Sequence, residues 1–366
     1  MKVSVHPKAL LDRFEVAASC APKRSSIDIL TNVHMEATSD GYLILTGTDT
    51  ETGIRVKLPC EVESPGLALA PRDRLLAILS ESQFDLIEFN ATSEMLEVRC
   101  GKSVFKLQSA DPKEYPRPKM ESPAVSASMP FDAFHQAVTH TSYATDPDST
   151  RFSLGGVLLE FDDGACNFVA TDGRRLSTVE VPCGGELKRS FIIPSRSLLA
   201  LCRSKCSGDL VIGEWNNSII ISTDEMQFFA REIDGKFPNW RTVIPKTDDA
   251  CAIDVGVKPF SSLMRLASIT QDVETRGIDM RFDDGRIQAG CATADVGQSS
   301  VECECSGVLD DSKLPITIKV DSRFVLEFLK SLHGDDSVTI FVSSGTGPML
   351  ITTGNQKYII MPMAQS

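Results

Sequence analysis

Three stretches of the chain, about a third of its length apart, carry apolar residues at the spacing of one helix face. They contain Leu10, Leu11, Phe14, Ala17 and Ala18 in the first, Phe131, Phe134 and Val138 in the second, and Phe260, Leu263, Met264 and Ala267 in the third. Residues three or four positions apart share a face, so each stretch predicts an amphipathic helix. Alternating apolar residues follow, as in Ile287, Ala289 and Cys291, and they indicate strands.

A second helix is predicted in each third, at segments 71–76, 194–199 and 321–326. These segments open on Pro71, Pro194 and Asp321 and continue through an arginine into paired apolar residues. Proline and aspartate are favoured at helix starts, where the first amide groups lack partners within the helix. Further strands follow each of these helices and close the unit.

An internal repeat organises the sequence. Asp49, Asp172 and Asp295 each follow an apolar run and are spaced by 123 residues (172 − 49 and 295 − 172). A fixed period of this kind is the signature of repeated structural units. We expect an α+β protein of three domains, 1–120, 128–249 and 250–366, each with two helices packed on mainly antiparallel sheets.

Composition restricts the class of protein. Apolar residues make up 42% and charged residues 24% of the 366 positions, as in soluble globular proteins. The N-terminus lacks the apolar core of a signal peptide, and no segment has the apolar length to span a bilayer, so we expect a cytoplasmic protein. The eleven cysteines are scattered without the paired spacing of a zinc site. We expect reduced thiols, no metal and no cofactor.

The net charge of −13 argues against a protein coated in nucleic acid, because DNA would be repelled by its mean surface. A local basic surface remains compatible with that charge. Segment 187–206 has no acidic residue and carries Lys188, Arg189, Arg196, Arg203 and Lys205. This segment is either a solvated helix face or a surface that meets phosphates.

Three motifs make the sequence more specific: segments 171–176 (Thr-Asp-Gly-Arg-Arg-Leu), 234–241 (Asp-Gly-Lys-Phe-Pro-Asn-Trp-Arg) and 358–363 (Tyr-Ile-Ile-Met-Pro-Met). With the opening Met-Lys-Val, the length and the repeat, they resemble the bacterial DNA polymerase III β subunit, the β sliding clamp. The resemblance covers the whole chain. It implies three tandem DNA-clamp domains, a head-to-tail dimer that forms a closed ring, and a non-catalytic processivity factor that encircles duplex DNA.

The resemblance also implies three groups of site residues. The partner-peptide pocket would contain Leu154, Thr171, Gly173, Arg174, Arg175, Leu176, Pro238, Val243, Pro348, Ile359, Ile360, Met361, Pro362 and Met363. Arg24, Arg72, Arg196, Arg203 and Lys205 would face DNA, and Arg99, Lys102, Phe105, Leu107, Ile269, Glu302 and Glu304 would form the dimer interface. Implied partners are double-stranded DNA, the polymerase III catalytic subunit, the clamp loader, and other polymerases and repair proteins.

Two features of the implied pocket are particular to this sequence. Arg174 stands where the family frequently has histidine or tyrosine. Arg174 and Arg175 would either contact the polar atoms of a peptide or hold the turn in which they lie.

Other classes of function stay open at this stage. An enzyme is disfavoured because the sequence has no P-loop, no G-x-G-x-x-G turn and no H-E-x-x-H helix. A repeat-built interaction protein without DNA is disfavoured by the basic segment 187–206. A specialised clamp paralogue fits the sequence as well as the main replication factor does.

Overall fold

The computed structural model describes residues 1–92, 94–118, 120–204, 206–272, 274, 276–293, 296–308, 314–334 and 336–364. The chain divides into two compact units, which are considered separately. Unit 1 comprises residues 1–134, 162–164 and 183–232, and unit 2 comprises residues 135–161, 165–182 and 233–366. Among the described residues, no helix is long and apolar enough to cross a membrane.

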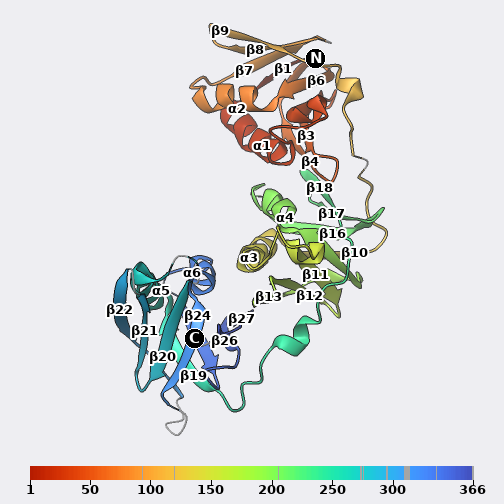
Figure 1. The fold of residues 1–366 in the computed structure, drawn as a ribbon. Helices are drawn as coiled ribbons and strands as arrows, with labels where there is room; N and C mark the ends of the chain where they lie inside the picture. Colours follow the sequence, from red (N-terminus) through yellow and green to blue (C-terminus); the bar gives the residue numbers. More distant parts are fainter. Residues whose placement is uncertain are drawn as a thin grey trace. The chain divides into compact units, whose positions relative to one another are not determined.

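The same order of elements occurs three times: a strand, a helix, five strands, a helix and three strands (Figure 1). The first set is β1 (Lys2–Val5), α1 (Pro7–Cys20), β2 (Asn32–Ala37), β3 (Tyr42–Thr48), β4 (Thr52–Pro59), β5 (Glu61–Ser64), β6 (Gly66–Pro71), α2 (Arg72–Glu81), β7 (Ile87–Ala91), β8 (Met95–Cys100) and β9 (Ser103–Gln108). The second is β10 (Ser126–Pro130), α3 (Phe131–Ser142), β11 (Gly156–Asp162), β12 (Ala165–Thr171), β13 (Arg175–Pro182), β14 (Gly184–Gly185), β15 (Arg189–Pro194), α4 (Ser195–Cys202), β16 (Asp209–Trp215), β17 (Ser218–Ser222) and β18 (Met226–Arg231). The third is β19 (Cys251–Gly256), α5 (Val257–Ala267), β20 (Gly277–Asp283), β21 (Arg286–Thr293), β22 (Gly297–Glu304), β23 (Ser306–Val308), β24 (Ile316–Asp321), α6 (Ser322–Lys330), β25 (Ser337–Val342), β26 (Met349–Thr353) and β27 (Gln356–Ile360).

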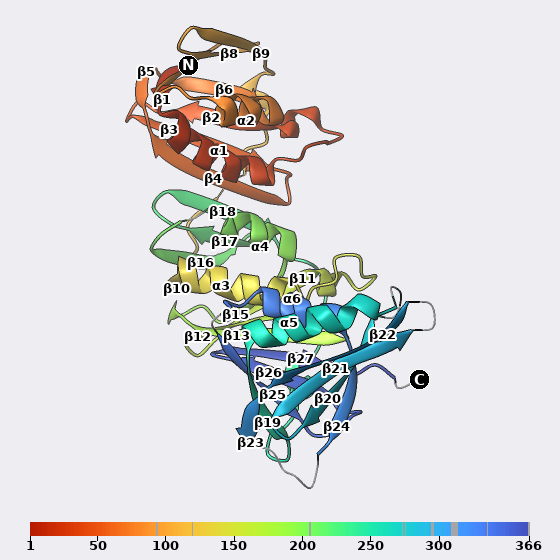
Figure 2. The same cartoon turned by 90° about the vertical axis from the view of Figure 1, so that its left-hand side faces the viewer.

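The predicted α+β fold and its threefold repeat are therefore confirmed. The apolar helix faces are buried, with Leu10 and Phe14 of α1 and Phe260 of α5 each 0% exposed. The second helix of each set begins directly after Pro71, Pro194 or Asp321. Within each unit the helices pack in pairs, α1 beside α2 (Figure 1) and α5 beside α6 (Figure 2).

The sheets are antiparallel and do not follow the repeats one by one. In unit 1 one sheet has the strand order β5-β1-β7-β8-β9, and a longer one has the order β14-β10-β16-β17-β18-β4-β3-β2-β6. In unit 2 the long sheet contains, in order, β11-β12-β13-β27-β26-β25-β19-β23, and the other is β22-β21-β20-β24. Each long sheet thus joins strands of two successive repeats. The domain limits 1–120, 128–249 and 250–366 stay a prediction.

Two junctions between repeats use equivalent strands. In unit 1, β18 pairs antiparallel with β4, with Met226 opposite Val56. In unit 2, β27 pairs antiparallel with β13, with Gln356 opposite Val179. In both cases the last strand of one repeat joins the fourth strand of the repeat before it. Among the last and fourth strands of the three repeats, β9 (the last of the first repeat) and β22 (the fourth of the third) make no such junction, and each lies at one end of its sheet.

Candidate functional site

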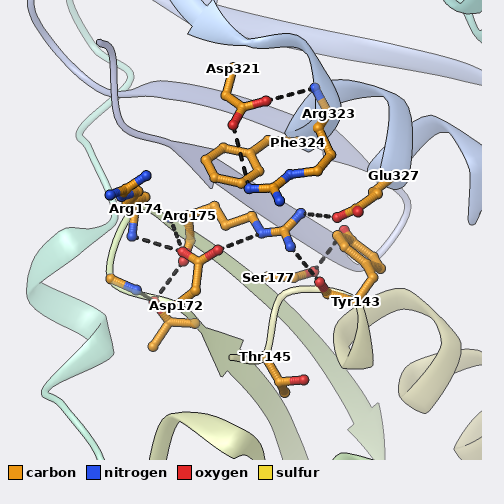
Figure 3. Close-up of polar contacts among 12 residues, drawn as sticks. Tyr143, Thr145, Asp172, Arg174, Arg175, Ser177, Asp321, Arg323, Phe324 and Glu327 are labelled. Carbon is orange, nitrogen blue, oxygen red and sulfur yellow. Dashed lines mark hydrogen bonds and ion pairs between the residues drawn. The ribbon is translucent and has the colours of Figure 1, made fainter. Parts of the chain in front are cut away.

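The turn between β12 and β13 is closed by its own side chains (Figure 3). The hydroxyl of Thr171 donates to the carbonyl of Arg175 at 2.6 Å and accepts from the amide of Gly173 at 3.1 Å. One carboxylate oxygen of Asp172 accepts from the amides of Arg174 at 2.8 Å and Arg175 at 3.0 Å. Gly173 has φ +87°, a backbone conformation that favours glycine. The turn therefore has a fixed shape that its sequence specifies.

The first repeat contains the same turn. Thr48 donates to the carbonyl of Thr52 at 2.8 Å, and one oxygen of Asp49 accepts from the amide of Thr52 at 2.7 Å. In the third repeat Thr293 donates to the carbonyl of Gly297 at 3.4 Å. Asp295 lies outside the described residues, and it follows its threonine by two positions rather than one. The equal spacing of the three aspartates thus marks equivalent positions only in the first two repeats.

Arg175 is a buried ion-pair centre, with 6% of its surface exposed. Its Nε donates to Asp172 at 2.9 Å, its Nη1 donates to Glu327 of α6, and its Nη2 donates to the carbonyl of Tyr143 at 2.6 Å (Figure 3). The guanidinium also lies 4.4 Å from the ring centroid of Phe324. A buried charge is tolerated only when its donors are satisfied in this way. Of the two roles expected for Arg175, holding the turn fits its burial.

Further buried polar groups continue this network along the β13–β27 junction. Ser177 donates to the carbonyl of His140 at 2.6 Å, and the Nε2 of Gln356 donates to the same carbonyl at 2.9 Å. Tyr358 donates to the carbonyl of Phe324 at 3.0 Å. Burial raises the pKa of the Tyr358 phenol well above its ordinary value, so this hydroxyl stays a hydrogen-bond donor.

The chain after β27 forms one wall of a cavity of about 600 Å³, here called the tail cavity. The amide of Met361 donates to the carbonyl of Arg174 at 2.8 Å, and the amide of Met363 donates to the carbonyl of Lys319 at 2.8 Å. These two bonds attach the tail to both neighbouring segments. The cavity is lined by Arg174, Glu274, Arg276, Asp321, Arg323, Phe324, Met361, Pro362, Met363 and Ala364.

Only some of the residues expected in the peptide pocket line the tail cavity. Arg174, Met361, Pro362 and Met363 line it, whereas Leu154, Thr171, Arg175, Leu176, Ile359 and Ile360 are buried, Gly173, Pro238 and Val243 are exposed, and Pro348 is half-buried. The sequence did not indicate the other lining residues as part of a pocket: Glu274, Arg276, Asp321, Arg323, Phe324 and Ala364. Of these, the sequence pattern singled out only Asp321 and Arg323, as the start of a predicted helix. Nothing in the sequence placed them near Arg174.

The corresponding corner of unit 1 has the same backbone bond and different side chains. There the amide of Arg231 donates to the carbonyl of Glu51 at 2.8 Å, as Met361 does to Arg174. The side chains of Glu51 and Arg231 then form an ion pair of 3.1 Å across that corner. At the junction of β27 with β13 the equivalent positions are Arg174 and Met361, and both line the tail cavity. The same backbone junction is therefore present twice, with an exposed ion pair at one corner and the tail cavity at the other.

The residues expected to face DNA differ in exposure. Arg24, Arg196 and Arg203 are exposed on unit 1. Arg72 is half-buried, and its Nε donates to the carbonyl of Ala18 at 2.9 Å, at the end of α1. Lys205 lies outside the described residues.

The residues expected at the dimer interface lie on the end strands or beside them. On the β8–β9 hairpin, Lys102 is exposed, Phe105 is 39% exposed and Leu107 is 7% exposed, while exposed Arg99 pairs with Glu97 at 2.9 Å. In unit 2 Glu302 and Glu304 of β22 are exposed, and Ile269 is 70% exposed. Leu107 thus belongs to the core under β9, whereas the others are at the surface.

Comparison with known proteins shows the family. The model of the DNA polymerase III beta subunit N-terminal domain matches residues 1–120, and the model of its central domain matches residues 128–239. Together they span well over half of the chain, which therefore belongs to the DNA polymerase III β subunit family.

Individual relatives match over the full length. The chain is 26% identical to the beta sliding clamp of Pseudomonas aeruginosa, over 99% of this chain and 100% of that protein. It is 25% identical to the beta sliding clamp of Escherichia coli K12, again over 99% and 100%. A crystal structure of a P. aeruginosa DnaN sliding clamp bound to griselimycin has a TM-score of 0.91 at 22% identity and covers 100% of both chains. At that identity the structural likeness shows the fold.

We expect Arg175→Met to lower the free energy of unfolding of unit 2 by about 3 kcal/mol, because Asp172 and Glu327 lose their buried partner. The matched control is Arg281→Met, which removes an exposed arginine paired with Asp283 at 3.4 Å, and it should change stability by less than about 0.5 kcal/mol. Urea unfolding followed by circular dichroism measures both. Equal stability of the two variants would contradict the role given to Arg175.

Proposed function

We propose that the protein is a sliding clamp and a non-catalytic accessory subunit of DNA polymerase III. Two chains form a head-to-tail ring around duplex DNA, and partner proteins bind the ring through short peptides. The clamp acts in the cytoplasm, where a bacterial chromosome is replicated. Family membership and the names of the full-length relatives support this function.

The observation that carries the proposal is the pair of strands left at sheet ends. Two junctions inside the chain join the last strand of one repeat to the fourth strand of the repeat before it. The remaining partners of the same kind are β9 and β22. Pairing β9 of one chain with β22 of another, twice, repeats the internal junction and closes a ring. A two-fold symmetric dimer suffices, and closure pairs the edges of β9 and β22 that would otherwise stay open.

The internal junctions also predict the register between chains. In each repeat the threonine of the turn donates a hydrogen bond to a backbone carbonyl, that of Thr52, Arg175 or Gly297. The residues four positions after these carbonyls are Val56, Val179 and Val301, so Val301 is the equivalent position in β22. Each valine inside the chain pairs with the first residue of a last strand, and the first residue of β9 is Ser103. The expected pairs are Ser103 with Val301, Val104 with Ser300, Phe105 with Ser299 and Leu107 with Gly297.

The two edges are chemically complementary in this register. Lys102 comes opposite Glu302, so a basic hairpin meets an acidic strand. Exposed pairs contribute only about 0–1 kcal/mol each, so they orient the chains. Phe105 lies on the face of β9 opposite to Lys102. Burial of the Phe105 side chain against Ile269 of the other chain would remove apolar surface from water and stabilise the dimer.

Retention on DNA follows from topology rather than affinity. Arg24, Arg196 and Arg203, with Lys205, would meet phosphates in the hole through contacts that carry no sequence information. The chain as a whole is acidic, with a net charge of −13, so strong adhesion to DNA is avoided. A clamp of this kind can slide along the duplex without dissociating.

The tail cavity would receive partner peptides. Met361 is 41% exposed and Met363 is half-buried, and flexible methionine side chains adapt to different apolar anchors. Candidate partners are the polymerase III catalytic subunit, the clamp loader, and other polymerases and repair proteins. One ring would carry two such sites, which permits exchange of bound partners.

Deletion of residues 361–366 should abolish binding of the polymerase catalytic subunit, because it removes one wall of the tail cavity. The ring should stay dimeric, since β9 and β22 are intact. Surface plasmon resonance measures binding, and light scattering measures assembly. Deletion of residues 365 and 366 alone serves as the control and should bind normally. Unchanged binding by the longer deletion would show that partners use another site.

A cross-link tests the register between chains. In a chain carrying both Val104→Cys and Ser300→Cys, mild oxidation should give covalent dimers on a non-reducing gel. Each single variant controls for the native cysteines. Val104→Cys with Val301→Cys is the offset control, because neighbouring residues of a strand point to opposite faces. Equal yields from the two double variants would refute this register.

A further inference from the structure

We propose that unit 1 contains a binding site for small phosphate esters, between its long sheet and the chain segment that follows the first repeat. The site is a cavity of about 420 Å³, here called the linker cavity. It is lined by Glu36, Thr46, Arg55, Arg117, Pro118, Met120 and Glu121. The tail cavity, in contrast, is lined by residues of unit 2.

One wall of the linker cavity is a row of side chains across three strands. β4, β3 and β2 are neighbours in the long sheet of unit 1 (Figure 2). His34 of β2 lies opposite Thr46 of β3, and Thr46 lies opposite Arg55 of β4. Residues opposite each other in an antiparallel pair share a face of the sheet, whereas the buried Val33 and Met35 point to the other face. His34 therefore points to the side of the sheet on which the cavity lies.

The other wall is the chain after the first repeat, which Tyr115 attaches to the sheet. The Tyr115 hydroxyl is shared between the carbonyls of Asn32 at 3.3 Å and Thr46 at 3.4 Å. Its ring centroid lies 5.5 Å from that of His34, and Tyr115 is 3% exposed. Arg117 follows two residues later. The buried tyrosine thus fixes where the backbone of this wall begins.

His34 is a buried side chain without hydrogen-bond partners. It is 1% exposed, and neither ring nitrogen has a partner among the described residues. Burial, followed by the charges of Arg117 and Arg55, lowers the pKa of His34 to about 4. The imidazole is therefore neutral at pH 7 and has one N–H to donate. A buried donor left without an acceptor costs free energy, so an acceptor bound beside this ring would stabilise the site.

Two guanidinium groups at the linker cavity have donors available. Arg117 is exposed, and within the part of the chain that the structure describes it forms no hydrogen bond or ion pair. Arg55 pairs with Glu36 at 3.6 Å, and its side chain is 43% exposed. That separation is too long for a good hydrogen bond, so N–H groups of Arg55 are free to bind a ligand. A phosphate group has three acceptor oxygens, enough for both arginines and a further donor.

The rest of the lining favours an ester over a free phosphate ion. Glu36 and Glu121 oppose the two arginines in charge, so a second source of affinity is needed. Pro118 and Met120 are half-buried and present apolar surface to the same cavity. Burial of a small apolar group against them adds to binding. The linker cavity therefore fits a phosphate that carries such a group.

The test uses phenyl phosphate and inorganic phosphate, titrated into the full-length protein at constant ionic strength and followed by calorimetry. Both should bind saturably, with phenyl phosphate roughly fivefold tighter because its ring is buried. Benzoate has the same ring and only two acceptor oxygens, and it should bind roughly tenfold more weakly than phenyl phosphate. Equal weak binding of phenyl phosphate, benzoate and chloride would show a general anion surface and overturn the site.

Nuclear magnetic resonance of labelled histidine rings locates the bound ligand. Phenyl phosphate should shift the ring signals of His34, which are identified by their loss in the variant His34→Leu. His6 and His135 are exposed and do not line the cavity, so their signals should not move. Movement of those signals in place of the His34 signals would put the phosphate elsewhere on the protein.

Charge variants test the lining directly. Arg117→Gln should weaken binding of phenyl phosphate roughly tenfold. Arg231→Gln is the matched control, an arginine of unit 1 whose side chain is 64% exposed, and it should leave the affinity unchanged. Glu121→Gln should strengthen binding, because it removes an opposing charge. Thermal melts confirm that each variant is folded, and an unchanged affinity in folded Arg117→Gln would refute the site.

These measurements do not depend on the proposed function, because they are made on the protein without DNA or partner proteins. A protein that binds phenyl phosphate and fails to stay on circular DNA would keep this site and lose the clamp function. The opposite result would keep the clamp function and exclude the linker cavity as a phosphate site.

Discussion

Antiparallel pairing between the last strand of one repeat and the fourth strand of its neighbour is the interaction on which the structure depends. It satisfies backbone N–H and C=O groups that would otherwise form an open edge. The chain makes this junction twice, at β18–β4 and β27–β13, and ends with one unused partner of each kind. In the proposed ring a second copy of the chain would supply the missing partners, so the ring would extend the internal fold.

The same junction creates the candidate binding site. Pairing of β27 with β13 brings the tail to the turn at Thr171, where Met361 bonds to the carbonyl of Arg174. Beneath the turn, Arg175 is bound by two carboxylates and a carbonyl and connects the second repeat to α6 of the third. The exposed Arg174 and Met361 thus lie next to a buried polar network centred on Arg175. In unit 1 an ion pair between Glu51 and Arg231 occupies the equivalent corner.

Local features could be predicted from the sequence because their signals are local. Helical spacing of apolar residues and the breaks at Pro71 and Pro194 located helices correctly. In the turn at Thr171, the threonine hydroxyl and the Asp172 carboxylate both bond to the backbone of the turn. Leu107, expected at the dimer surface with Phe105, belongs to the core under β9, which alternation along the strand does not reveal by itself.

Features that depend on distant segments could not be predicted. The sharing of sheets between repeats requires knowing which strands pair across more than a hundred residues. The tail cavity combines Arg174 with Arg276 and Arg323, and no spacing rule connects these positions. The burial of Arg175 and the exposure of Arg174, adjacent and chemically identical in the sequence, depend on where α6 packs. The family resemblance implied Arg174, Met361, Pro362 and Met363 as pocket residues, and the structure adds the charged residues that line the tail cavity with them.

Retention on DNA of different topology tests the central claim most directly. The protein would be loaded onto nicked circular plasmid by a clamp loader and passed through a gel-filtration column before and after linearisation of the DNA. The account predicts co-elution with the circle and loss from the linear duplex, because a ring slides off a free end. Equal retention on both forms, or on neither, would contradict a closed ring around DNA.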